Sequence, residues 1–146
     1  VERNAKLFFC ADQVILGLVP IVITSGKDQH LLTEYFASLR ELASDYSGYR
    51  FLPGHYGEFT EIKEETDRII AGYGERCTQL RQSNRPMTLL ELDQALYIQR
   101  MQTYRYSFLF SYLHTWPKLF SCLDWLFETG VIDRTEQDGV LYWSLR

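Results

Sequence analysis

The chain has 146 residues, of which 46% are hydrophobic and 15% aromatic, a composition that supports a packed core and excludes a disordered chain. Its 15 Lys and Arg residues against 19 Asp and Glu give a formal net charge of −4, which argues against general binding to nucleic acid or to an anionic membrane surface. The longest apolar run, residues 14–23, contains Gly17 and Pro20 and is too short to span a bilayer.

The three cysteines, Cys10, Cys77 and Cys122, lie far apart and form no CxxC pair. Neither a zinc knuckle nor a disulfide framework is therefore indicated. We expect these thiols to be small apolar parts of the core in a reducing compartment, and hence a cytoplasmic protein.

The first predicted element is a buried strand over residues 6–10, with Asp12 at its end. An ionised carboxylate beside so much apolar sequence needs a partner, because an unpaired buried charge costs several kcal/mol. A helix or turn cap, a salt bridge or a metal ion would each supply one. The apolar run at 14–23 should then lie as a loop over the edge of a sheet.

Residues 29–46 have apolar side chains at helical spacing, which predicts an amphipathic helix with one buried face. His30 stands at the start of this helix, where the helix dipole disfavours its cationic form, so we expect a surface residue or at most one that lines a pocket. The apolar stripe consists of Leu31, Leu32, Tyr35, Phe36, Leu39, Leu42 and Ala43.

A second strand, over residues 49–52, runs into a Pro-Gly-His-Tyr-Gly segment at 53–57. The Pro-Gly pair stops the strand and turns the chain, and the two glycines leave room for a sharp bend and for the close approach of another group. His55 therefore stands on a turn after a strand, where metal ligands and catalytic residues are often found. The alternative is a surface turn whose histidine has no role.

Residues 59–83 again have helical periodicity, with glutamates in the first turns and arginines toward the C-terminal end, as the helix dipole favours. The segment Asn84-Arg85-Pro86 is the best internal boundary. The buried stripe of this helix is expected to be Ile62, Ile69, Ile70, Tyr73, Cys77 and Leu80.

Beyond this boundary the pattern changes to short helices followed by a hairpin. Thr88 and Glu91 have the spacing of a capping box, and Gly130 is placed as a helix C-terminal cap. Asp138-Gly139 is a strong hairpin turn signal. The expected elements are helices at 88–97, 104–114 and 117–128 and strands at 131–134 and 140–145.

Three helices followed by a hairpin is the order of a winged helix, a module that often reads DNA. From Pro86 onward the chain has five Lys and Arg against seven Asp and Glu, and the helix at 117–128 has one basic residue, Lys118. Phosphate contacts need clustered cations, so a structural or dimerising tail is favoured over a DNA reader. His114, in an aromatic helix, is favoured as a packed core residue rather than a ligand.

Two segments resemble motifs of the metallo-β-lactamase fold. Residues 6–12 resemble that family's strand ending in Gly-Asp, whose aspartate bridges two metal ions. Residues 52–55 resemble its late strand ending in Pro-Gly-His, and the elements between the two segments follow the family's order. Two positions depart from the pattern: Ala11 replaces the usual glycine, and Tyr56 stands before Gly57 where the family continues directly with glycine.

The resemblance implies an α+β fold in three parts. Residues 1–58 would be the C-terminal part of an αββα metallo-β-lactamase sandwich, 59–85 a helical linker and 86–146 a winged-helix-like domain. It also implies a hydrolase in which Asp12 and His55 are metal ligands and Tyr56 lines the substrate pocket. The family's main motif, His-x-His-x-Asp-His, is absent from this sequence. The chain would therefore be a fragment, with the missing N-terminal half as its partner.

In the intact protein, two divalent ions are expected, with zinc as the first choice and iron or manganese as alternatives. A metal-bound hydroxide would attack a small thioester or ester substrate. The fragment alone is expected to be inactive. The alternative function is an interaction module, in which residues 59–146 mediate homodimerisation, and a nucleic-acid-binding regulator is less favoured.

Overall fold

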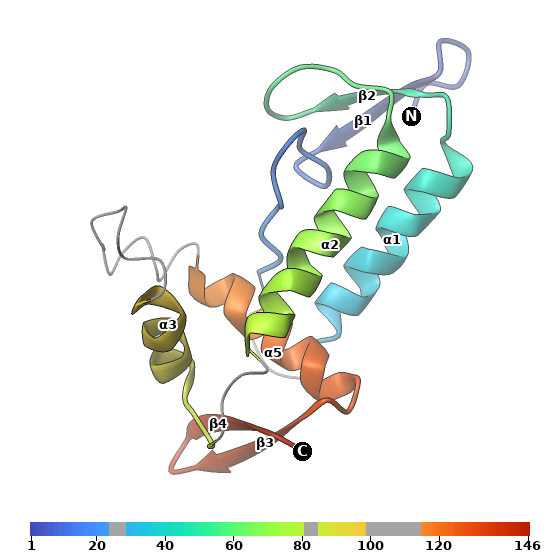
Figure 1. Ribbon diagram of the computed structural model, residues 1–146. Coiled ribbons are helices and arrows are strands. Elements are labelled where there is room, and N and C mark those ends of the chain that lie inside the picture. Colours follow the sequence, from blue (N-terminus) through green and yellow to red (C-terminus); the bar gives the residue numbers. More distant parts are fainter. Residues whose placement is uncertain (24–28, 81–84, 99–114) are drawn as a thin grey trace. The chain divides into compact units, whose positions relative to one another are not determined.

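A computed structural model describes residues 1–23, 29–80, 85–98 and 115–146 (Figure 1). The chain divides into two compact units, the first made of residues 1–20 and 33–74 and the second of residues 21–32 and 75–146. Helix α1 (Leu31–Asp45) begins in the second unit and continues into the first, whereas helix α2 (Ile62–Leu80) begins in the first and ends in the second. The predicted domain boundaries at residues 58 and 85 stay predictions.

The first unit contains a two-stranded parallel sheet formed by β1 (Leu7–Ala11) and β2 (Arg50–Pro53). Both strands lie within one residue of their predicted bounds. Since parallel strands run in the same direction, the turns that follow β1 and β2 leave the sheet at the same edge (Figure 1).

Helices α1 and α2 lie side by side in this unit, and an aromatic cluster joins them (Figure 1). The ring of Tyr73 on α2 packs edge-on against Phe36 of α1, with 5.7 Å between ring centroids. The predicted stripes are confirmed for most of the members whose burial is described, whereas Leu31, Tyr35, Ala43 and Ile70 are half-buried. The fully or almost fully buried members are Leu32, Phe36, Leu39, Leu42, Ile62, Ile69, Tyr73 and Cys77.

Strand β1 is less buried than its composition predicts. Cys10 is buried, but Phe9 is 64% exposed, and the Asp12 side chain after the strand is 66% exposed. The prediction of a fully buried strand beside a buried carboxylate is therefore wrong within the described residues. The physical reason is that only one face of β1 is covered here: Cys10 points to the covered face, and Phe9 and Ala11 point to the other, whereas parallel strands are normally covered on both faces.

The second unit contains helices α3 (Leu89–Ile98) and α5 (Trp116–Glu128) and the antiparallel hairpin of β3 (Ile132–Gln137) and β4 (Val140–Leu145). The capping box is confirmed, because the Glu91 carboxylate accepts the Thr88 N–H and the Thr88 hydroxyl accepts the Glu91 N–H. Gly130 caps α5 with φ +73.

The hairpin turn is also confirmed, with Asp138 and Gly139 both at positive φ, as a type I′ turn requires. The helix predicted at 104–114, together with His114, lies outside the described residues. The winged-helix assignment of the tail stays a prediction. No helix in the described ranges combines the length and apolar character that crossing a bilayer requires.

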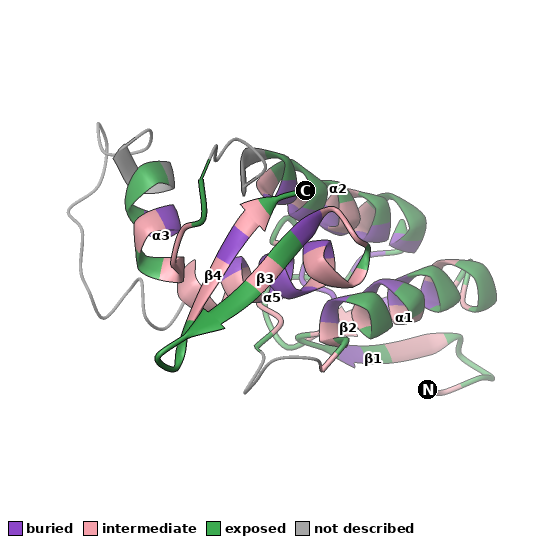
Figure 2. Ribbon diagram, turned by 90° about the horizontal axis from the view of Figure 1, so that it is seen from below, coloured by how far each residue is buried: buried purple, intermediate pink, exposed green. Residues whose placement is uncertain are grey.

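A buried ion pair joins α5 to the hairpin. The Arg134 guanidinium donates to Asp124 Oδ1 at 2.7 Å, and the two side chains are only 10% and 7% exposed. The guanidinium carbon also lies 4.2 Å from the centre of the Phe127 ring. Asp124 is one of the buried residues of α5, the helix whose burial is coloured in Figure 2. Because a buried carboxylate needs a cation, this pair fixes the hairpin's packing on α5.

Replacing Asp124 by Ala should leave Arg134 buried without its partner and lower the free energy of unfolding by roughly 3–5 kcal/mol. The matched control is Asp133→Ala, which removes the exposed pair with Arg146 and should cost less than about 1 kcal/mol. Urea unfolding followed by circular dichroism measures both variants. Equal losses in the two variants would contradict the structural role of the buried pair.

Candidate metal centre

The structure brings together the two residues predicted as metal ligands. Asp12 follows β1 by one residue and His55 follows β2 by two. His55 Nε2 lies 3.7 Å from Asp12 Oδ1. Both side chains are about two-thirds exposed, at 65% and 66%, so the pair faces open space rather than the core. Pairing of the two strands therefore gathers an imidazole and a carboxylate at one sheet edge.

Gly54 lets the Asp12 carboxylate approach the second turn. A Cβ atom on Gly54 would lie 2.6 Å from Asp12 Oδ1, closer than real Cβ contacts allow. The Gly54 N–H also donates to the Ala11 carbonyl at 2.9 Å. The predicted close approach at a glycine is thus confirmed for Gly54. It is wrong for Gly57, where an added Cβ would meet nothing within 4 Å.

The backbone adopts the left-handed conformation on both sides of this contact. Ala11 has φ +47 and Tyr56 has φ +65. These are the two positions at which the sequence departs from a glycine in the motifs it resembles. A side chain there costs roughly 1–2 kcal/mol relative to the right-handed conformation. Strain of this kind is concentrated at functional sites, and the Tyr56 side chain beside His55 is 72% exposed.

The pair fits a divalent metal ion as part of a larger ligand set. Zinc binds an imidazole nitrogen or a carboxylate oxygen at about 2.0–2.2 Å, so two such atoms on one ion lie at most about 4.3 Å apart. The observed 3.7 Å lies within that limit. Within the described ranges, no three His, Cys, Asp or Glu side chains are grouped for a metal. Asp12 and His55 therefore supply two donors, fewer than the four that a tetrahedral site needs.

Cys10, although close in sequence, is not a third donor in this arrangement. Its thiol is buried and donates to the Val14 carbonyl at 3.5 Å. Burial raises the pKa of the Cys10 thiol above its usual value, which disfavours the thiolate that a metal requires.

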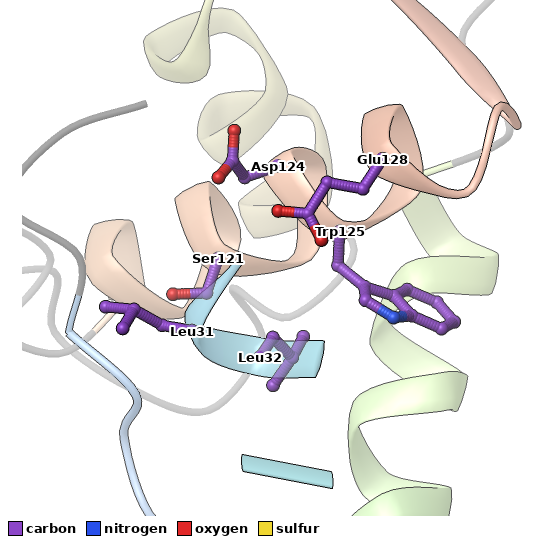
Figure 3. Close-up of a pocket in the computed structure, with 6 residues that line it drawn as sticks. All are labelled: Leu31, Leu32, Ser121, Asp124, Trp125 and Glu128. Atoms are coloured by element: carbon purple, nitrogen blue, oxygen red, sulfur yellow. The ribbon is translucent and has the colours of Figure 1, made fainter. Parts of the chain in front are cut away.

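A second polar cluster lines a small pocket in the second unit (Figure 3). His30 is not in the lining but beside it, with Nδ1 2.8 Å from Glu128 Oε1, and its side chain is 62% exposed, so the expectation of a surface histidine is confirmed. Asp124, which is in the lining, is engaged by Arg134. The cavity of about 10 Å³ has room for about one water molecule, too little for a substrate. The lining residues are Leu31, Leu32, Ser121, Asp124, Trp125 and Glu128.

The cations of the tail that the structure describes are Lys118, Arg134 and Arg146. The two arginines pair with Asp124 and Asp133. Burial, with a smaller contribution from Arg76, lowers the pKa of Lys118 to about 8. These contacts add no support for DNA reading, which needs cations free to meet phosphates.

Comparison with solved structures identifies the fold. A metallo-β-lactamase family protein from Thermus thermophilus matches with a TM-score of 0.75 and 19% identity, over 98% of this chain and 43% of that protein. A β-lactamase domain protein from Burkholderia ambifaria matches with a TM-score of 0.77 and 16% identity, over 96% of this chain and 41% of that protein. No family model and no curated protein matches the sequence.

The chain thus has the fold of part of a metallo-β-lactamase family protein and spans less than half the length of these two structures. The resemblance first drawn from residues 6–12 and 52–55 is confirmed at the level of fold. The identities are too low to carry an activity or a substrate from one protein to the other.

Replacing Gly54 by Ala should push the Asp12 carboxylate away from His55, because the new methyl group would collide with Asp12 Oδ1. The free energy of unfolding should change by less than about 1 kcal/mol, since Asp12 is exposed and able to rotate. A crystal structure of the variant measures the Asp12–His55 separation. Gly57→Ala is the control, because its methyl group enters open space. An unchanged 3.7 Å separation in Gly54→Ala would contradict the steric argument.

Proposed function

We propose that this chain is the C-terminal part of a metal-dependent hydrolase that acts on a thioester or an ester. The observation that carries the proposal is the Asp12–His55 pair, 3.7 Å apart at the shared end of two parallel strands. The metallo-β-lactamase fold supports it, because that fold typically binds metal ions. Neither residue is needed for the hydrophobic core, since both are exposed.

Asp12 and His55 would be among the residues that hold two divalent metal ions. When bound, such ions polarise a scissile carbonyl and lower the pKa of a water molecule. Gly54 keeps the carboxylate beside the imidazole by leaving the space that a side chain would fill. Zinc suits this mixed nitrogen and oxygen set best, with iron or manganese as alternatives.

The remaining ligands would come from an N-terminal half of the same protein. Two observations support this partner. The chain spans 43% and 41% of the two similar structures, and its described residues offer two metal donors rather than a complete set. Phe9 is exposed on one face of β1, and the missing half of the protein would cover that face, because parallel sheets are normally buried on both faces. The chain alone would then lack hydrolase activity.

The substrate class follows from charge and from Tyr56. A net charge of −4 disfavours a polyanionic substrate, which makes a small thioester or ester the better choice. Tyr56 is 72% exposed next to His55, where its ring can pack against an acyl group. Its backbone is in the left-handed conformation, so the ring is carried by a strained turn and not by a flexible loop.

The His55→Ala variant of the complete protein should lose bound metal and lower kcat/KM for a thioester by more than about 100-fold, because removing even an outer partner of a ligand costs 10–100-fold. Elemental analysis and a hydrolysis assay measure the two effects. The control is His30→Ala, which removes an exposed histidine paired with Glu128 and should keep both metal and turnover. Full activity in His55→Ala would sink the proposed ligand role.

A further inference from the structure

Backbone carbonyls on both sides of Asp12 accept hydrogen bonds from other parts of the first unit. Before Asp12, the Ala11 carbonyl accepts the Gly54 N–H at 2.9 Å. After Asp12, the Gln13 carbonyl accepts the Tyr35 hydroxyl at 2.7 Å. The Asp12 side chain itself is 66% exposed, so core packing does not set its direction. Its position is therefore set by these flanking peptide groups.

Helix α1 holds Gln13 at a second point as well. The Gln13 side-chain amide donates to Ser38 Oγ at 3.0 Å, and the Ser38 hydroxyl donates to the Tyr35 carbonyl at 2.8 Å. Tyr35 and Ser38 are three residues apart on one face of α1. The residue directly after Asp12 is thus bound to α1 by its carbonyl and by its side chain.

The Tyr35 hydroxyl is suited to a permanent structural role. The residue is half-buried, and burial raises the pKa of its phenol well above the usual range. The raised pKa favours the protonated hydroxyl, which is the form that donates to the Gln13 carbonyl. Its ring is fixed in turn by the aromatic contact with Tyr73, at 6.4 Å between centroids.

A nearly identical hydrogen bond occurs farther along the same loop. The Tyr73 hydroxyl, on α2, donates to the Pro20 carbonyl at 2.7 Å. It supports the loop eight residues beyond Asp12, whereas Tyr35 supports the residue adjacent to it. The chain therefore provides two tyrosines of the same chemistry, of which only one touches the segment that carries the carboxylate.

We infer that Tyr35 is a positioning residue for the metal ligand Asp12, acting through the Gln13 carbonyl. Helix α1 thereby sets the direction of a carboxylate that the core does not touch. The inference rests on the proposed function, since positioning has a consequence for chemistry only if Asp12 binds a metal ion. Tyr35 belongs to the apolar stripe of α1, and that position alone indicates only a role in core packing.

The test compares Tyr35→Phe with Tyr73→Phe, each of which removes one hydroxyl and leaves the ring. The first readout, without metal, is the backbone amide order parameter of Asp12. It should fall from a rigid value of about 0.85 toward 0.6 in Tyr35→Phe and stay unchanged in Tyr73→Phe. Ser38→Ala, which removes the acceptor of the Gln13 amide, should lower it as well. Equal mobility of Asp12 in all variants would overturn the inference, as would an equal loss in Tyr73→Phe.

The second readout is a Zn²⁺ titration followed through the imidazole NMR signals, which are resolvable because the chain has three histidines. The wild-type His55 signals should respond, and the apparent affinity should fall by roughly 10-fold in Tyr35→Phe. If wild-type His55 responds to Zn²⁺ neither in this chain nor in the complete protein with its N-terminal half, while Asp12 mobility depends on Tyr35, the proposed function is contradicted and the positioning is established. A wild-type response that Tyr35→Phe does not weaken would contradict the inference and keep the proposed function.

Discussion

The parallel pairing of β1 with β2 is the constraint on which the rest of the first unit depends. Because the two strands run in the same direction, the turns after them meet at one edge of the sheet. The Gly54 N–H joins the two turns by donating to the Ala11 carbonyl. An antiparallel pairing would have sent Asp12 and His55 to opposite ends of the sheet. Helix α1 makes the parallel arrangement possible, since it returns the chain to the start of β2.

At the candidate metal centre the main chain determines more than the core does. Asp12 and His55 are exposed, so neither is directed by apolar packing. Their placement comes from a missing Cβ at Gly54, from left-handed backbone at Ala11 and Tyr56, and from hydrogen bonds to the peptide groups next to Asp12. The core supports this indirectly, because α1, the helix that supplies the Tyr35 hydrogen bond, is joined to α2 by aromatic contacts.

Local patterns in the sequence predicted the elements that depend on local chemistry. The capping box before α3, the Asp138-Gly139 turn and the stripes of α1 and α2 all agree with the structure, because caps, turns and helical faces are determined by near neighbours. The pairing of Asp12 with His55 was predictable as well, although only through the resemblance of two segments to one fold. Without that resemblance, Asp12 could equally have been a cap or a salt-bridge partner, and His55 a surface residue with no role.

Features that depend on distant residues were not predictable. The exposure of Phe9 reflects what covers its face of β1, which no local pattern reports. The burial of Asp124 depends on Arg134, which lies in the next strand and on its own looks like a surface charge. Tyr35 was assigned to an apolar stripe, and its hydroxyl bond to Gln13 joins residues of a loop and a helix that sequence spacing does not connect.

The central claim is that Asp12 and His55 bind the same divalent ion. The most direct measurement is anomalous X-ray diffraction at the zinc edge from crystals of the complete protein, with its N-terminal half, grown with Zn²⁺. An anomalous peak is expected within about 2.2 Å of both Asp12 Oδ1 and His55 Nε2. Zinc bound elsewhere on the chain, with no peak between these two atoms, would contradict the claim.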